Sequence, residues 1–137
     1  MINYLILCVC CLASSNILAS TKGVAIDPLI IKIAKNGSAK FNLLNDTTQQ
    51  FIAIIKIIDT NNENIPTPFV ASMPVQILKE NSNVSLKIFS LKKECNALNN
   101  KYYLSVTFIP KSEKEEYRSF IPIVLTQQVP IEIVNPK

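Results

Sequence analysis

The C-terminal stretch YYLSVTFIPKSEKEEYRSFIPIVLTQQVPIEIVNPK, residues 102–137, decides the fold class. Its first run alternates strictly, with Tyr102, Leu104, Val106 and Phe108 on one face. A charged loop, KSEKEEYRS, separates this run from a second alternating run that reaches almost to the last residue. A period of two residues is typical of β-strands. The sequence therefore predicts two long strands joined by a charged loop.

The closing run is unusually long and apolar on one face. Its odd-numbered positions are Ile121, Ile123, Leu125, Gln127, Val129, Ile131 and Ile133. Strands in globular proteins usually have five or six residues. A long apolar strand at a sheet edge invites aggregation unless it has a partner. We therefore expect the strand to pair with a second protein, or with another copy of this chain through the exposed edge.

Earlier segments supply further strands. LIIKIA (29–34) and AKFNLLN (39–45) flank Asn36-Gly37, a dipeptide typical of hairpin turns, and the pattern predicts a strand, a turn and a strand. QQFIAIIKIIDT (49–60) and VSLKIFSL (84–91) also read as strands. The prolines of IPTPFVASMPVQIL (65–78) predict an irregular edge segment with a short strand near its end. About seven short strands indicate an all-β sandwich.

Composition limits the size and the partners of the protein. A chain of 137 residues with 48% hydrophobic content is long enough for one compact domain. The net charge of +4 comes from lysines scattered along the chain, without a basic cluster. This distribution argues against nucleic-acid binding.

The N-terminal stretch MINYLILCVCCLASSNILAS, residues 1–20, predicts a secretory signal peptide. Its apolar region runs from Tyr4 to Ala13, and small residues favour cleavage after Ala19 or Ser20. We expect export to the periplasm and a mature domain over residues 21–137. Because three of the four cysteines would be removed, the mature chain would keep only Cys95 and could form no internal disulfide.

The residue inventory argues against catalysis. The chain has no histidine to activate Cys95, only two glycines and no CxxC motif. Asp27, Asp46 and Asp59 fall at predicted strand ends or turns, where aspartate commonly bonds the local backbone. We therefore expect a binding or structural protein without a cofactor, a metal or an enzymatic activity.

Several segments together resemble a known family. GVAIDP, ASMPVQIL, YYLSVTFIP, the charged loop and the long closing strand are similar, in order and spacing, to the N-terminal domain of PapD-like periplasmic pilus chaperones, from Gly23 to Pro136. The resemblance implies an immunoglobulin-like sandwich. It also implies that the last strand lends its apolar side chains to an incomplete pilus subunit, which is donor-strand complementation.

The resemblance implies partners and site residues as well. The partners would be pilus or fimbrial subunits and an outer-membrane usher. The donor residues would be Ile121, Ile123, Leu125 and Gln127. The family anchors the carboxylate of the subunit with two basic residues, which would fall near Ile30 and near Ile131 or Glu132; these are not basic, and Lys32 is the closest candidate.

Two alternatives remain open at this stage. The family's usual second domain is expected to be absent because the sequence ends at Lys137, so the chain could be a truncated chaperone without function. It could also be a secreted sandwich subunit of a surface fibre. Such subunits usually carry an N-terminal alternating extension and a cysteine pair, whereas GVAIDPLIIKIA runs directly into the first predicted hairpin.

Overall fold

The computed structural model describes residues 22–34, 37–61, 66–91, 101–111 and 123–134. The described residues form nine strands and no helix, so the expected all-β class is confirmed and the expected strand number of about seven was too low. The strands are β1 (Val24–Asp27), β2 (Ile31–Ala34), β3 (Ser38–Asn45), β4 (Phe51–Asp59), β5 (Phe69–Ala71), β6 (Val75–Leu78), β7 (Ser82–Ser90), β8 (Tyr102–Pro110) and β9 (Leu125–Val134).

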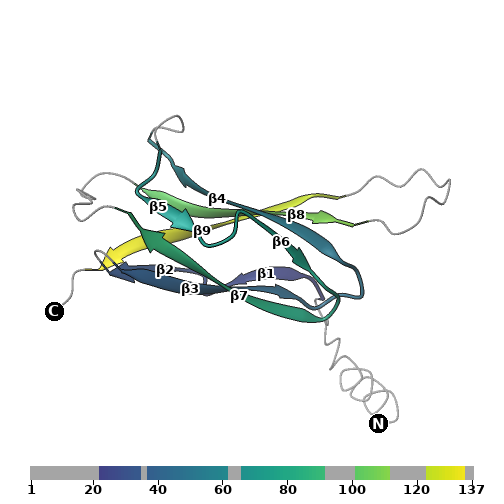
Figure 1. Ribbon diagram of the computed structural model, residues 1–137. Coiled ribbons are helices and arrows are strands. Elements are labelled where there is room, and N and C mark those ends of the chain that lie inside the picture. The colour runs from purple at the N-terminus through teal and green to yellow at the C-terminus, as the bar shows by residue number, and fades with distance from the viewer. Residues whose placement is uncertain (1–21, 35–36, 62–65, 92–100, 112–122, 135–137) are drawn as a thin grey trace, which may run out of the picture.

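The strands form two sheets that pack face to face (Figure 1). The first sheet has the order β1-β3-β7-β5, and the second has the order β2-β9-β8-β4-β6. All neighbouring strands are antiparallel except β2 and β9, which are parallel. The first described strand, β1, belongs to the first sheet, and the next strand, β2, belongs to the second sheet.

Alternation along the strands builds the core between the sheets. On β8, the four predicted inward residues Tyr102, Leu104, Val106 and Phe108 are all buried, as expected for a central strand that has one face on the core. β7 contributes Leu86 and Ile88 in the same way. The remaining buried apolar residues are Ile26, Ile31, Ile33, Phe41, Leu43, Ala53, Ile55, Phe69, Leu78, Val129 and Ile131.

The hairpin predicted at Asn36-Gly37 was wrong. The Gly37 N–H does donate to the Ala34 carbonyl at 2.8 Å, so the chain turns there. However, β2 pairs with β9, whereas β3 pairs with β1 and β7. The turn joins the two sheets, and both flanking strands turn their apolar side chains into the space between them. Turn chemistry is local and does not say whether the flanking strands pair with each other.

The proline-rich segment lies at the sheet edges, as predicted. It forms two short strands where one was expected: β5 is the edge of the first sheet and β6 is the edge of the second. Between them, the Pro74 carbonyl accepts a hydrogen bond from Ile55 at 2.8 Å. Prolines are tolerated here because Pro66, Pro68 and Pro74 all lie outside the two strands, where no ladder N–H is needed.

The connection after β3 is organised by one buried polar side chain. The Asn45 side chain is 2% exposed, and its Nδ2 donates to the carbonyls of Gln49 at 2.8 Å and Lys79 at 2.7 Å. Its Oδ1 accepts from Thr47 Oγ1 at 2.7 Å. The Asn45 side chain thus links the turn that follows β3 to the turn between β6 and β7 by hydrogen bonds.

Replacing Asn45 with alanine is expected to lower the free energy of unfolding by about 2 to 3 kcal/mol, since several backbone groups would lose their partners. Urea denaturation would measure the loss. Asn42→Ala is the matched control, because Asn42 is half-buried on the same strand. Equal losses in the two variants would contradict the role assigned to Asn45.

Candidate strand-docking edge

The two edges of β9 are covered to different extents. Its β8 edge is paired from Leu125 to Ile131. Its other edge is paired with β2 only from Ile131 to Val134. From Leu125 to Pro130, no described strand pairs with β9 on that second side. This stretch, together with Ile123 and Val124 before it, is called the open segment below.

The open segment presents apolar side chains that the domain itself does not cover. Ile123 is 82% exposed and Leu125 is 48% exposed. Leu125 shares its face of β9 with Val129 and Ile131, which are 2% and 7% exposed. The apolar row that the sequence showed as continuous is therefore divided into a covered half and an uncovered half. Ile121 lies outside the described residues.

Gln127 lies where the two halves meet. It is half-buried, and its Oε1 accepts a hydrogen bond from the Ile26 N–H at 3.0 Å. Ile26 belongs to β1, the edge strand of the opposite sheet. Of the three predicted donor residues that the structure describes, Gln127 is thus the one whose side chain has a hydrogen-bond partner within the domain.

The open segment rests on a well-packed support. Phe108, which is opposite Leu125 in the β8–β9 register, is fully buried. On the outer face, the hydroxyls of Thr107 and Thr126 are 3.0 Å apart, within hydrogen-bonding distance. These contacts hold the beginning of β9 against β8, so its free edge is presented in an extended conformation.

Lys32 lies apart from the open segment. It is exposed on β2, and its register partner on β9 is Glu132. β2 covers the part of β9 that follows the open segment. The acidic residue Glu132 is therefore the cross-strand neighbour of Lys32, the candidate anchor for the subunit carboxylate. The anchoring role of Lys32 stays a prediction.

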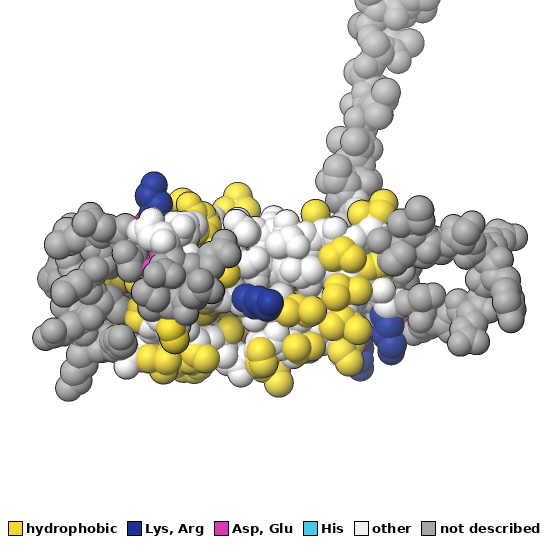
Figure 2. All heavy atoms as spheres, turned by 90° about the horizontal axis from the view of Figure 1, so that it is seen from above, with side chains coloured by type: hydrophobic (Ala, Val, Ile, Leu, Met, Phe, Trp, Pro, Cys, Tyr) yellow, Lys and Arg dark blue, Asp and Glu magenta, His cyan; other side chains and the backbone are white. Residues whose placement is uncertain are grey.

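A second apolar surface lies on the outer face of the second sheet. Val75 and Ile77 of β6 are each about half exposed, at 53% and 52%, and they pair in register with Ile54 and Ile52 of β4. Ile109 of β8 follows next to Ile52. Figure 2 shows hydrophobic side chains gathered on the face seen from above. We call these five residues the outer patch. The sequence alone did not indicate this patch, although Val75 and Ile77 alternate as strand residues do.

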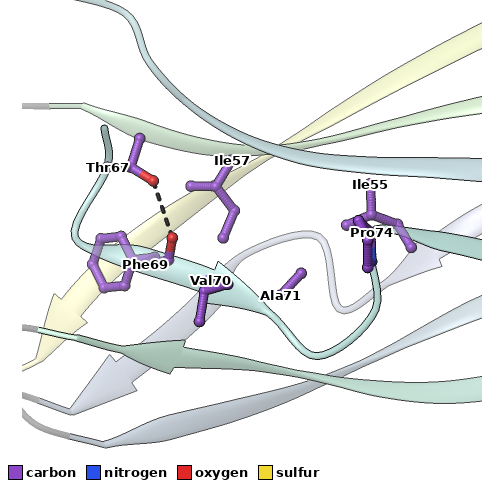
Figure 3. Close-up of a pocket in the computed structure, with 7 residues that line it drawn as sticks. All are labelled: Ile55, Ile57, Thr67, Phe69, Val70, Ala71 and Pro74. Atoms are coloured by element: carbon purple, nitrogen blue, oxygen red, sulfur yellow. Dashed lines mark hydrogen bonds between the residues drawn. The ribbon is translucent and has the colours of Figure 1, made fainter. Parts of the chain in front are cut away.

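The described residues also contain an open pocket between β4 and β5 (Figure 3). Its volume is about 230 Å³, and the lining residues are Ile55, Ile57, Thr67, Phe69, Val70, Ala71 and Pro74. The Thr67 hydroxyl donates to the Phe69 carbonyl at 3.1 Å. No lining residue is charged, so the pocket holds no acid, base or anionic ligand for a metal. Among the described residues, no three metal-binding side chains cluster, and no helix is long and apolar enough to cross a membrane.

Comparison with known proteins identifies the family. Residues 23–137 match the family model of the pili and flagellar-assembly chaperones, PapD N-terminal domain. The chain belongs to this chaperone family. Protein FasC of Escherichia coli is 32% identical to it over 114 residues, covering 81% of this chain and 73% of FasC. The expected family is thereby confirmed, and chaperone membership implies a role other than catalysis.

Solved structures agree on the fold. The structure of the Salmonella enterica SafA pilin in complex with the SafB chaperone matches with a TM-score of 0.68 at 12% identity, covering 83% of this chain and 55% of that one. The E. coli chaperone DraB matches with a TM-score of 0.67 at 14% identity, covering 84% of this chain and 56% of DraB. The immunoglobulin-like sandwich is thus confirmed, and this chain spans a little over half of the matched chain in each of these two structures.

Proposed function

We propose that this domain is a pilus-assembly chaperone that holds a subunit against the open segment of β9 by donor-strand complementation. The observation that carries the proposal is the exposure of Ile123, just before β9, and of Leu125, the first residue of β9, a strand whose continuation is core. The family and the pilin complexes of relatives such as SafB with SafA support a subunit as the partner.

The physical basis is the addition of a strand. Main-chain hydrogen bonds along an edge give affinity with little demand on the sequence of the partner, while alternate side chains enter its pockets. Burying an Ile or Leu side chain contributes about 1.5 to 3 kcal/mol. Ile123 and Leu125, with Ile121 before them as the third proposed donor, could supply much of the binding energy before ordering costs are subtracted.

We include export, an usher as second partner and a carboxylate contact at Lys32 in the same proposal. Residues 1–20 would direct export and be cleaved, so the domain of residues 21–137 would act in the periplasm. An outer-membrane usher would be the second partner. The β6 part of the outer patch suits a second contact. Two strands, β8 and β4, separate Val75 and Ile77 from β9, so these residues would stay free while the open segment is occupied. Lys32 is retained as a proposed contact for the subunit carboxylate.

The test begins with purification of the exported protein and identification of the protein that accompanies it. That subunit is then produced alone, denatured, and diluted into buffer with or without the purified chain. We expect an equimolar, soluble complex with the chain present and aggregation of the subunit without it. Light scattering and size-exclusion chromatography would measure both.

Two results would overturn the proposal. In the first, the subunit aggregates equally with and without the chain. In the second, the chain becomes part of a growing subunit polymer and cannot be separated from it. The second result would favour the alternative of a structural fibre subunit. A folded chain that binds no subunit would favour the alternative of a truncated, inactive chaperone. Size-exclusion chromatography of the free chain would also report self-association through β9.

A further inference from the structure

Gln127 joins the two sheets within the open segment, at the point where the apolar row of β9 changes from uncovered to covered. β1 pairs with β3 on one side, and the Ile26 N–H points to the other side, where Gln127 Oε1 accepts it at 3.0 Å. Gln127 is on the face of β9 that also carries Leu125 and Val129. The amide side chain therefore crosses the seam between the sheets and gives the Ile26 N–H a partner.

The position of this link matters because strand registers can slip. If the bound strand slipped along β9 by one residue, every side chain of that strand would turn to the wrong face, so alternation excludes this slip. A slip by two residues keeps every side chain on its face. Leu125, Gln127 and Val129 follow one another at two-residue intervals on one face. Gln127 is the polar residue among them, and its side chain already accepts a hydrogen bond from Ile26. A strand shifted by two residues would therefore meet a different side chain at this point.

We propose that Gln127 is a positioning residue that sets the C-terminal limit of the docking segment and so fixes the register of the bound subunit strand. The inference rests on the proposed function. A partner strand can pair with β9 as far as Gln127. Beyond it, Val129 is buried, Pro130 has no N–H to donate and β2 occupies the edge from Ile131.

An apolar residue at position 127 would remove the contribution of this side chain to the limit in two ways, while Val129, Pro130 and β2 would stay in place. It could not accept the Ile26 N–H, which would lose its partner in a half-buried seam. It would also extend the apolar row from Leu125 to Val129 without interruption. Gln127→Leu is therefore expected to admit a second register, shifted by two residues, whereas Gln127→Glu keeps an acceptor oxygen and should keep one register.

The free chain is tested first by amide hydrogen exchange. We expect the Ile26 amide of Gln127→Leu to exchange at least about tenfold faster than that of the wild type, with a much smaller change in Gln127→Glu. Because this measurement needs no partner, its result does not depend on the proposed function. An unchanged Ile26 amide in Gln127→Leu would overturn the inference.

The register is then read by disulfide cross-linking. The probe is the subunit identified above, with single cysteines along the strand that meets β9. The chain carries Val124→Cys, which is 50% exposed in the open segment, and Cys95→Ser. We expect one cross-linked subunit position with wild-type Gln127 and with Gln127→Glu, and two positions, two residues apart, with Gln127→Leu.

The remaining outcomes separate the two proposals. A single, identical position in all three variants would show that Gln127 stabilises the domain without setting the register, and would overturn this inference while leaving the chaperone function standing. Failure of the wild-type chain to bind the subunit would overturn both.

Discussion

Replacing both Ile123 and Leu125 with aspartate is expected to abolish stable subunit capture while leaving the domain folded. Both side chains are largely or half exposed in the free chain, so the domain gains little stability from them. In the complex, loss of two buried aliphatic side chains would remove about 3 to 6 kcal/mol. That is a loss of affinity of at least about a hundredfold, before the cost of burying a carboxylate is added.

Co-refolding with the purified subunit would measure this effect, and circular dichroism would confirm that the variant folds. The matched control is Val75→Asp with Ile77→Asp, because these outer-patch residues are comparably exposed and lie at the opposite edge of the same sheet. We expect the control to bind the subunit as the wild type does. If the double variant of Ile123 and Leu125 still binds, or if the control loses binding, the docking surface does not lie on β9.

Replacing Phe108 with alanine is expected to lower the free energy of unfolding by about 3 to 5 kcal/mol, through lost apolar transfer and the cavity left behind. Phe108 is 0% exposed and lies between Ala53 on β4 and Leu125 on β9 in the register of the second sheet. Since a domain of this size is stabilised by about 5 to 15 kcal/mol in total, the variant would unfold at markedly lower urea concentration.

The control for this variant is Ile109→Ala. Ile109 is the next residue of β8, points to the outer face and is half-buried, so its truncation is expected to cost about 1 kcal/mol or less. Urea denaturation followed by circular dichroism would compare the two. Similar losses would contradict the assignment of Phe108 to the core. Phe108→Leu, which keeps most of the volume, should recover most of the stability.

Much of the fold could be predicted because burial follows local alternation. The inward face of β8 and the edge positions of the proline-rich segment both come from patterns within a few residues. The partners of each strand could not be predicted in this way. β2 and β3 are neighbours in sequence and their turn is a hairpin signal, yet β2 pairs with β9, about a hundred residues away.

The candidate site shows the same division. The sequence alone determined that the closing strand is long, that its odd face is apolar and that Ile123 and Leu125 lie on that face. Only the tertiary structure decided which part of the face is free. Val129 and Ile131 are covered by the domain, Ile123 and Leu125 are not, and the boundary lies at Gln127 because β1 of the opposite sheet meets β9 there. Alternation in the sequence shows which side chains share a face. Whether the domain itself covers these side chains depends on contacts between residues far apart in the chain.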